Sequence, residues 1–144
     1  MRPRPPRAVV RAYSRFHAWL LGATRGRIGG RLGRTRVLLL ETRGRKSGEA
    51  RRTPVYFVRD GADVIVVASN WGRDDDPAWY RNLMARPDDA AMVVDGRRTA
   101  VRPEAVAHAD RERVWKAADA AYPQYADYRK WTRREIPLVR LMPR

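Results

Sequence analysis

Apolar residues between Val9 and Leu21 recur at intervals of three or four positions, and arginines fill several positions between them. This spacing gathers the apolar side chains on one face and predicts an amphipathic α-helix. Such a helix either packs on the body of the domain, or lies on an anionic membrane or beside a lipophilic substrate channel. Residues 1–6 are rich in proline and arginine and are expected to be disordered, while the glycines from Gly22 to Gly33 predict a loop.

Beyond this loop, the pattern changes to short, valine-rich runs bounded by turn residues, which is typical of β-strands. The predicted strands are Val37–Glu41, Pro54–Arg59, Asp63–Ala68, Ala91–Asp95, Arg98–Val106 and Pro137–Met142. Asp60-Gly61 and Asp95-Gly96 supply the positive backbone angles that tight hairpins require. Most gaps between the strands are too short for the helical crossovers of a parallel sheet. We therefore expect an antiparallel sheet closed into a small barrel.

Further helices are expected between and after these strands. They cover Pro77 to about Ala85, about Asp110 to Ala121, and Gln124–Arg133. Asp76 is a favourable N-cap for the first of them, and Pro77 suits the first helical position because its missing N–H needs no partner there. The predicted fold class is α+β, with mainly antiparallel strands and flanking helices.

The composition is that of a globular protein, and it excludes several kinds of site. A chain of 144 residues fits one domain with one core. The absence of cysteine excludes disulfides, thiolate metal ligands and a cysteine nucleophile. His17 and His108 lie too far apart in sequence to suggest a zinc site, so no metal is expected. No segment has the roughly 20 apolar residues that span a bilayer, and Ala18–Ala23 is too short for a signal peptide, so we expect a cytoplasmic protein.

The formal net charge is +15, and ten arginines precede the first acidic residue, Glu41. A surface this basic favours a polyanionic partner: a nucleic acid, an anionic lipid surface or a phosphorylated, carboxylate-bearing cofactor. The charge alone does not choose among them. No nucleic-acid reader motif is present and the aromatic residues are not interleaved with the basic ones, so no nucleic-acid partner is expected.

The segment Gly44-Arg45-Lys46-Ser47-Gly48 joins two predicted strands. Such a loop can point backbone N–H groups, an ammonium and a hydroxyl at one phosphate, or it can be a solvated basic hairpin tip. It is not a Walker A loop, because Arg45 separates Gly44 from Lys46 and no helix follows.

More blocks follow this loop along the chain. They are Arg51, Thr53-Pro54, Ala68-Ser69-Asn70-Trp71-Gly72, Pro77-Ala78-Trp79-Tyr80-Arg81-Asn82-Leu83, Ala85-Arg86-Pro87, Tyr122-Pro123-Gln124-Tyr125-Ala126-Asp127-Tyr128 and Ile136-Pro137-Leu138-Val139. Taken together and in this order, they resemble the deazaflavin-dependent nitroreductase family, of the F420H2-dependent quinone reductase type, over about residues 35–144. The resemblance implies a split β-barrel that binds coenzyme F420 in residues 35–144, preceded by a basic tail and amphipathic helix in residues 1–34.

The cofactor implied by this resemblance is F420, a 5-deazaflavin whose tail carries a phosphate and several glutamates. Arg45, Lys46, Ser47 and Arg51 would hold the phosphate, and Pro54 and Tyr56 would lie near the cofactor body. Ala68, Ser69, Asn70, Trp71 and Gly72 would lie along the ring system, and Trp79, Tyr80, Asn82 and Leu83 would complete the pocket. The anionic tail would then be the partner of the basic surface.

Tyr122, Tyr125 and Tyr128 are spaced by three residues, which places them near one face of a short helix. Taken alone, this pattern indicates aromatic core packing. The resemblance implies instead that the three tyrosines shape the acceptor pocket, with Trp131 extending the same wall. Beside the ring-binding block lies Asp74-Asp75-Asp76, of which we expect Asp76 to cap the following helix and the other two to be solvated.

The implied activity is hydride transfer from reduced F420 to a small organic acceptor such as a quinone, an enone or a nitro compound. The protein would bind and orient both molecules and exclude water, and Ser69, Tyr128 or solvent would supply a proton. The alternatives are a split-barrel protein that binds FMN, a basic nucleic-acid-binding module, and a membrane-surface protein without enzymatic activity. The N-terminal helix is the candidate contact with an anionic membrane, which would place the protein at its periphery.

Overall fold

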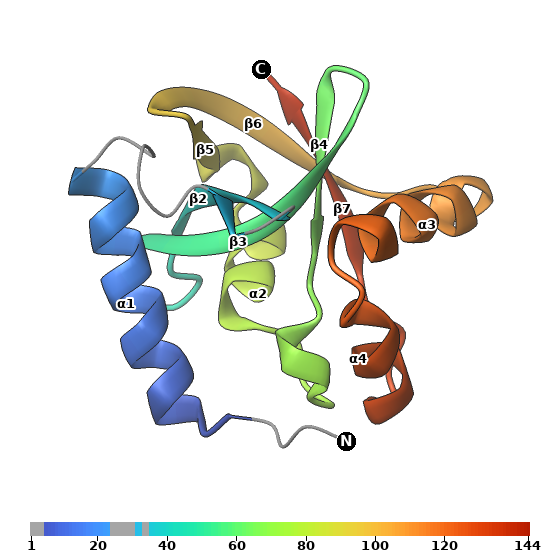
Figure 1. Ribbon diagram of the computed structural model, residues 1–144. Helices are drawn as coiled ribbons and strands as arrows, with labels where there is room; N and C mark the ends of the chain where they lie inside the picture. The colour runs from blue at the N-terminus through green and yellow to red at the C-terminus, as the bar shows by residue number, and fades with distance from the viewer. Residues whose placement is uncertain (1–4, 24–30, 33–34) are drawn as a thin grey trace.

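The described part of the chain, residues 5–23, 31–32 and 35–144 of a computed structural model, forms a barrel flanked by helices (Figure 1). The strands are β1 (Arg31–Leu32), β2 (Thr35–Arg43), β3 (Ala50–Asp60), β4 (Asp63–Val67), β5 (Ala91–Val94), β6 (Arg97–Ala105) and β7 (Leu138–Pro143). The α-helices are α1 (Arg7–Ala23), α2 (Ala78–Ala85), α3 (Arg111–Ala121) and α4 (Tyr125–Trp131). Short 3-10 turns are η1 (Asn70–Gly72), η2 (Pro87–Asp89) and η3 (His108–Asp110).

The sheet has the order β1-β2-β3-β4-β7-β6-β5, and every pairing within it is antiparallel. An additional antiparallel pairing of β2 with β5 closes the sheet into a barrel, with β1 extending it beside β2. Both Asp-Gly turns lie where the sequence predicts hairpins. Asp95 and Gly96 both have positive φ and join β5 to β6, and Gly61 has positive φ in the turn between β3 and β4. The predicted fold class is confirmed.

The apolar runs of β2 and β4 are continuous because both faces of these strands are buried. Leu38 and Leu40 of β2 belong to the interior cluster, whereas Val37 and Leu39 point to the outer face, where Ala18 of α1 packs. In the same way, Val64 and Val66 of β4 face the interior, while Ile65 and Val67 join the cluster under α3 and α4. Alternate side chains of a strand point to opposite faces, so helices on the outside of the barrel bury a second set of apolar residues.

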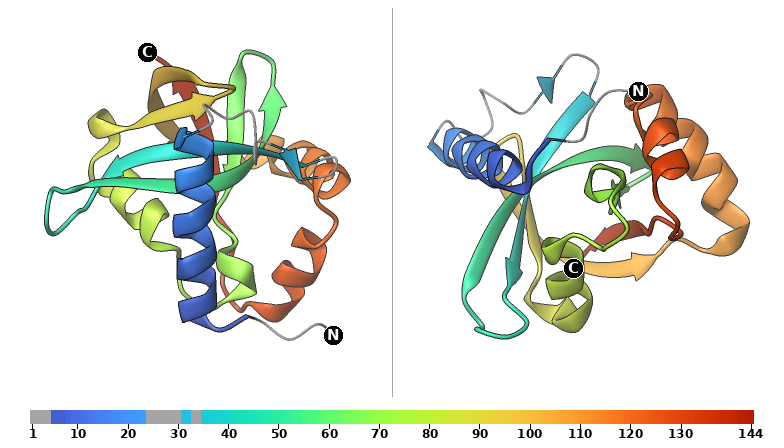
Figure 2. Two further views of the ribbon diagram at one scale, coloured as in Figure 1. Left: turned by 60° about the vertical axis from the view of Figure 1, so that its left-hand side comes forward. Right: turned by 90° about the horizontal axis from the view of Figure 1, so that it is seen from below.

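Helices α1 and α4 lie on opposite sides of one end of the barrel, with the segment after β4 between them (Figures 1 and 2). The predicted helix at Val9–Leu21 is confirmed as α1, and the predicted strands and later helices are confirmed with small shifts at their ends. Strand β1 was not predicted, and it lies within the expected glycine-rich loop. The predicted division between residues 34 and 35 falls beside residues that lie outside the described part, and it stays a prediction.

No helix within the described residues is long and apolar enough to cross a membrane.

Candidate functional site

A cavity of about 160 Å³ lies at the end of the barrel, between α1, β3, the segment after β4 and α4. Nine of the predicted site residues line it: Pro54, Tyr56, Ser69, Asn70, Trp71, Trp79, Tyr122, Tyr125 and Tyr128. These residues come from segments far apart in sequence. Their convergence on one cavity is the main reason to place the functional site here.

Four tyrosines form one wall of the cavity. The ring of Tyr122 lies 4.8 Å from that of Tyr56, 5.0 Å from that of Tyr125 and 6.2 Å from that of Tyr128, measured between centroids. Tyr122 is not part of the helix that carries Tyr125 and Tyr128, because it follows the last residue of α3 and precedes α4. The predicted clustering is therefore present, although it is produced by a turn as well as by a helix.

The hydroxyl groups on this wall are linked to one another. The Tyr122 hydroxyl donates to Oε1 of Gln124 at 2.6 Å and lies 3.3 Å from the Tyr128 hydroxyl. Burial is the largest cause that raises the pKa of Tyr56, to about 12, and the nearby Tyr122 adds to the effect. Burial and the hydrogen bond with Tyr122 likewise raise the pKa of Tyr128. Both phenols therefore keep their protons at neutral pH and can donate hydrogen bonds.

The segment that follows β4 forms a second wall. It presents Ser69, Asn70 and Trp71 to the cavity, and both Asn70 (φ 46°) and Trp71 (φ 59°) adopt left-handed backbone conformations. The Asn70 amide donates to the backbone carbonyl of Asp75 at 2.8 Å, which fixes its side chain. The Trp71 ring lies 6.3 Å from that of Tyr128, so this wall meets the tyrosine wall.

Within the acidic triplet, the predicted role of Asp76 as a helix cap is wrong. Helix α2 begins at Ala78 with Pro77 at its N-cap and no side-chain cap, so Asp76 does not cap it. The Asp76 carboxylate instead accepts a hydrogen bond from Arg134 at 3.0 Å. Its neighbours are bonded too: Asp74 accepts a hydrogen bond from the backbone N–H of Arg133 at 3.0 Å.

Asp75 forms an ion pair with Arg7, at the start of α1, at 3.1 Å. Asp74 is exposed and the Asp75 side chain is 41% exposed, so both carboxylates remain in contact with solvent as predicted, although each also has a partner distant in sequence.

The basic loop between β2 and β3 is anchored from α2. The Asn82 side-chain carbonyl accepts hydrogen bonds from the backbone N–H and the guanidinium of Arg45, at 3.1 and 3.0 Å. The Ser47 hydroxyl accepts the backbone N–H of Glu49 at 3.2 Å, and the Lys46 ammonium is exposed. Arg51 extends into solvent beside Glu49, at 3.3 Å. Arg45, Lys46 and Ser47 lie together on this loop, and Arg51 follows at the start of β3, but none of the four lines the cavity.

Helix α2 connects this loop to the cavity. Trp79 lines the cavity, and Asn82, one turn further along the same helix, holds the loop. Leu83 is fully buried in the barrel interior, and Tyr80 packs against the same cluster. Ala68 and Gly72 are buried, and Trp131 packs beside Tyr128 with ring centroids 5.5 Å apart. Five predicted site residues therefore lie behind the walls and do not line the cavity: Ala68, Gly72, Tyr80, Leu83 and Trp131.

Helix α1 supplies a wall that residue patterns did not assign to the site. Val10, Tyr13, Ser14 and His17 line the cavity. Helical periodicity predicted α1 itself. A location of this helix beside a substrate channel was among the alternatives that the sequence left open. The pattern could not select the face that meets the cavity, because Tyr13 and Val10 both fall within the apolar set.

The comparisons with known proteins agree with this arrangement. The family model described as F420H(2)-dependent quinone reductase matches residues 13–143. A Mycobacterium tuberculosis protein provisionally named as an F420H(2)-dependent quinone reductase is 40% identical over 108 residues, which cover 75% of this chain and 90% of that protein. A second M. tuberculosis protein, named F420H(2)-dependent quinone reductase, is 36% identical over 134 residues, covering 90% of this chain and 89% of the relative.

A solved structure of an F420-H2 dependent reductase has a TM-score of 0.66 and 32% sequence identity to this chain, covering 73% of it and 92% of the other. The split-barrel fold implied by the sequence resemblance is thereby confirmed. The matched residues include the tyrosine wall, the segment after β4 and the basic loop. The chain belongs to the F420H(2)-dependent quinone reductase family, and coenzyme F420 is its cofactor.

Proposed function

We propose that this oxidoreductase reduces a quinone, and by the same chemistry enones and nitro compounds, in the cavity between α1, β3, the segment after β4 and α4. When bound there, F420 in its reduced form supplies the hydride. The observation that carries the proposal is a cavity with aromatic walls and buried phenol donors, joined through α2 to a basic loop. A planar ring, a carbonyl acceptor and an anionic tail each have a matching surface.

The cavity lining fits a planar ring system. Pro54 and Tyr56 of β3, Trp71 and Trp79 offer apolar or aromatic surfaces, and stacking of rings on such surfaces stabilises binding. Ser69 and Asn70 add polar groups at the edge of the same space. We assign these residues to the cofactor body, and Tyr122, Tyr125 and Tyr128 to the acceptor.

The basic loop fits the anionic tail. Lys46 presents an exposed ammonium, Arg45 and Ser47 share its loop, and Arg51 follows at the start of β3. Charged donors bind phosphate with strong, short hydrogen bonds. The Asn82 anchor holds the Arg45 backbone in place before any ligand arrives, and such preorganisation lowers the entropy lost on binding.

The proton that completes reduction has two candidate sources on the cavity wall. A quinone takes up a hydride and one proton to become a hydroquinone, so a hydrogen-bond donor must face its carbonyl oxygen. Tyr128 keeps its proton at neutral pH and is linked to the Tyr122 hydroxyl, and Ser69 lies in the adjoining wall. We assign Tyr128 and Ser69 to binding and protonating the acceptor oxygen, a role that contributes part of the rate.

Titration with oxidised F420, followed by deazaflavin fluorescence with FMN run alongside, tests the cofactor site. We expect selective binding of F420 and at least about a tenfold loss of affinity in Lys46→Ala, because one charge-assisted contact is removed. Lys116→Ala is the matched control, since it removes the same charge from an exposed position on α3. A preference for FMN, or equal losses in the two variants, would overturn the assignment.

Turnover with the reduced cofactor tests the acceptor class. A naphthoquinone, an α,β-unsaturated ketone and a nitroaromatic would be compared at equal concentration, and we expect the quinone to react fastest. Tyr128→Phe keeps the ring and removes the donor, so it should lower kcat for the quinone with little change in the affinity for F420. A quinone slower than both other acceptors would contradict the proposed acceptor.

We further propose that α1 places the enzyme at the periphery of an anionic membrane, where lipophilic quinones are found. Val9, Phe16 and Trp19 are 57%, 60% and 65% exposed, and Tyr13, which lines the cavity, lies on the same side of the helix. Arg11 and Arg15 are exposed beside this apolar strip. An exposed apolar strip flanked by arginines suits an interface of anionic headgroups and acyl chains.

Sedimentation with phosphatidylserine-containing vesicles tests this placement. We expect the protein to sediment with these anionic vesicles and only weakly with vesicles of phosphatidylcholine alone. The double variant Phe16→Ser/Trp19→Ser should lose sedimentation with the anionic vesicles. Met84→Ser, which changes another exposed apolar residue on α2, should leave sedimentation unchanged. Equal sedimentation of the wild type and the double variant would exclude α1 as the contact.

A further inference from the structure

The segment from Ala68 to Asp76 holds a backbone conformation that its own sequence does not favour. Asn70, Trp71 and Gly72 have φ angles of 46°, 59° and 73° in succession. Asparagine and glycine tolerate the left-handed region, but a bulky residue such as tryptophan rarely adopts it. Such a conformation persists only where surrounding contacts determine it. Contacts from other parts of the fold must therefore hold this cavity wall in place.

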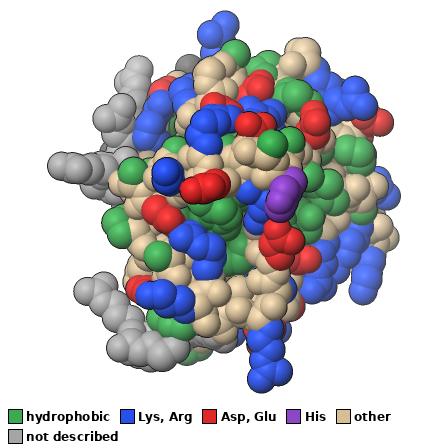
Figure 3. Space-filling model, turned by 90° about the vertical axis from the view of Figure 1, so that its right-hand side faces the viewer, with side chains coloured by type: hydrophobic (Ala, Val, Ile, Leu, Met, Phe, Trp, Pro, Cys, Tyr) green, Lys and Arg blue, Asp and Glu red, His purple; other side chains and the backbone are tan. Residues whose placement is uncertain are grey.

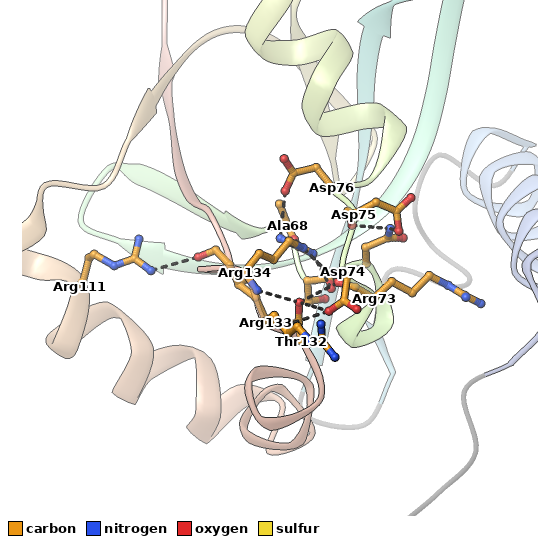
Figure 4. Close-up of polar contacts among 12 residues, drawn as sticks. Ala68, Arg73, Asp74, Asp75, Asp76, Arg111, Thr132, Arg133 and Arg134 are labelled. Carbon is orange, nitrogen blue, oxygen red and sulfur yellow. Dashed lines mark hydrogen bonds and ion pairs between the residues drawn. The ribbon is translucent and has the colours of Figure 1, made fainter.

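The Arg134 guanidinium bonds to both ends of this segment (Figure 4). Nη2 donates to the backbone carbonyls of Ala68 and Ser69, each at 3.0 Å. Nε donates to the carbonyl of Arg73 at 3.0 Å, and Nη1 donates to the Asp76 carboxylate at 3.0 Å. One planar group thus donates hydrogen bonds to two residues before the left-handed turn and to two residues after it.

The surroundings of Arg134 support this bridging geometry. The side chain is only 15% exposed, so its charge is largely removed from water and depends on these acceptors. The neighbouring Thr132 hydroxyl donates to the Arg73 carbonyl at 3.0 Å, which adds a second bond to the same carbonyl. Arg134 itself does not line the cavity, and it lies in the connection between α4 and β7.

We infer that Arg134 is a positioning residue that holds Ser69, Asn70 and Trp71 in the conformation that receives the cofactor ring. The inference rests on the proposed cofactor site. An arginine is required because its donors point in fixed directions within one plane, whereas lysine offers a single ammonium that cannot meet carbonyls on both sides of the turn. Arg134→Lys therefore keeps the charge and removes the bridge.

Hydrogen–deuterium exchange of the protein without cofactor gives a readout that is independent of activity. The amides of Gly72 and Arg73 bond to Ser69 and Asn70 at 2.9 and 3.1 Å, so they report on the turn. We expect these two amides to exchange at least about tenfold faster in Arg134→Lys, while amides of the β2–β3 hairpin keep their rates. Arg133→Lys is the matched control, because Arg133 is next to Arg134 in sequence and is exposed.

Affinity for oxidised F420 is then measured for the same variants. We expect Arg134→Lys to raise the Kd by about tenfold or more, and Arg133→Lys to leave it within about twofold. Asp76→Asn keeps an acceptor for Nη1 and removes only the charge, so it should give smaller changes in both exchange and affinity. If Arg134→Lys does not fold, the same two measurements on Asp76→Asn test the positioning role instead.

The two measurements separate the possible failures. If wild-type protein does not bind F420, the proposed function fails, whatever the exchange rates show. If wild-type protein binds F420 and loses it in Lys46→Ala, but Arg134→Lys leaves exchange or affinity unchanged, the positioning role is wrong. Equal effects of Arg133→Lys and Arg134→Lys would also overturn it, because they would reflect loss of general stability.

Discussion

At the scale of single residues, Asn82 links α2 to the basic loop. The residue is 7% exposed, and its side-chain carbonyl oxygen accepts two hydrogen bonds from Arg45. A truncated side chain would leave the Arg45 N–H without this partner and free the loop tip that carries Lys46. Loss of a buried acceptor is costly because the donor must then find water or remain unsatisfied.

Asn82→Ala should weaken F420 binding by up to about thirtyfold, because the two lost hydrogen bonds contribute about 1 kcal/mol each. Fluorescence titration measures the Kd, and thermal melting measures the accompanying change in stability. Met84→Ala, on the exposed side of α2, should change neither quantity appreciably. Unchanged affinity in Asn82→Ala would show that the loop needs no anchor to bind the tail.

The tyrosine wall predicts an unusual pH dependence. An ordinary tyrosine loses its proton at about pH 10. Burial and the contact with Tyr122 raise the pKa of Tyr128, and the pKa of Tyr56 is raised to about 12. Because a raised pKa keeps the phenol protonated to higher pH, kcat/KM for the quinone should stay level from about pH 8 to about pH 10. A pH–rate profile that falls near pH 9 to the same extent in wild type and Tyr128→Phe would exclude the phenol as the titrating donor.

At the scale of elements, η1 and α4 approach closely at Gly72. A Cβ at this position would lie 3.0 Å from the Cα and 3.2 Å from the carbonyl oxygen of Tyr128, both of which are backbone atoms. Gly72 also has a φ of 73°, which alone disfavours other residues. The contact sets the distance between the two walls that carry Trp71 and Tyr128.

Gly72→Ala should therefore destabilise the protein more than a change at another positive-φ glycine. Gly61→Ala is the matched control: its φ is 63°, and nothing lies within 4 Å of the added Cβ. We expect about 1 kcal/mol of backbone strain in both variants and about 1–3 kcal/mol more in Gly72→Ala from the clash. Thermal melting compares them, and equal melting temperatures would show that α4 moves away without cost.

Local patterns predicted the elements well because local forces determine them. Val37–Leu40 and Val64–Val67 are strands with two buried faces, and the Asp95-Gly96 pair determines its hairpin through its positive φ angles. Contacts between distant residues were beyond such patterns. Asp76 reads as a helix cap from its neighbours alone, but Arg134 lies 58 residues away and captures its carboxylate.

Part of the candidate site was also predictable from the sequence. Nine residues that line the cavity were named from the resemblance, and the structure brings them together, whereas Thr53, Val55 and Pro77 also line it and were not assigned to the site. The wall supplied by α1 was left open, because a helical repeat specifies an apolar face but not the surface that it covers. Arg134 carries no sequence motif, and only the convergence of four acceptors on its guanidinium identifies it.

At the scale of the whole molecule, the chain carries a formal net charge of +15. On the face that α3 and α4 form, arginine and lysine side chains alternate with acidic ones (Figure 3). Several arginines are engaged in ion pairs there, such as Arg129 with Asp119 at 2.6 Å and Arg113 with Asp60 at 2.8 Å. A surplus of positive charge attracts a polyanionic ligand over a distance set by the ionic strength.

F420 binding should therefore weaken as salt increases. Between about 50 mM and about 500 mM NaCl, we expect the Kd for F420 to rise by about tenfold, because the screening length shortens from about 14 Å to about 4 Å. A 5-deazaflavin that lacks the phosphate and glutamates is the matched ligand, and its Kd should change by less than about twofold over the same range. Lys46→Ala should flatten the salt dependence of F420 itself, since it removes one charge from the tail site. Equal salt dependence for the two ligands would mean that the basic surface does not bind the tail.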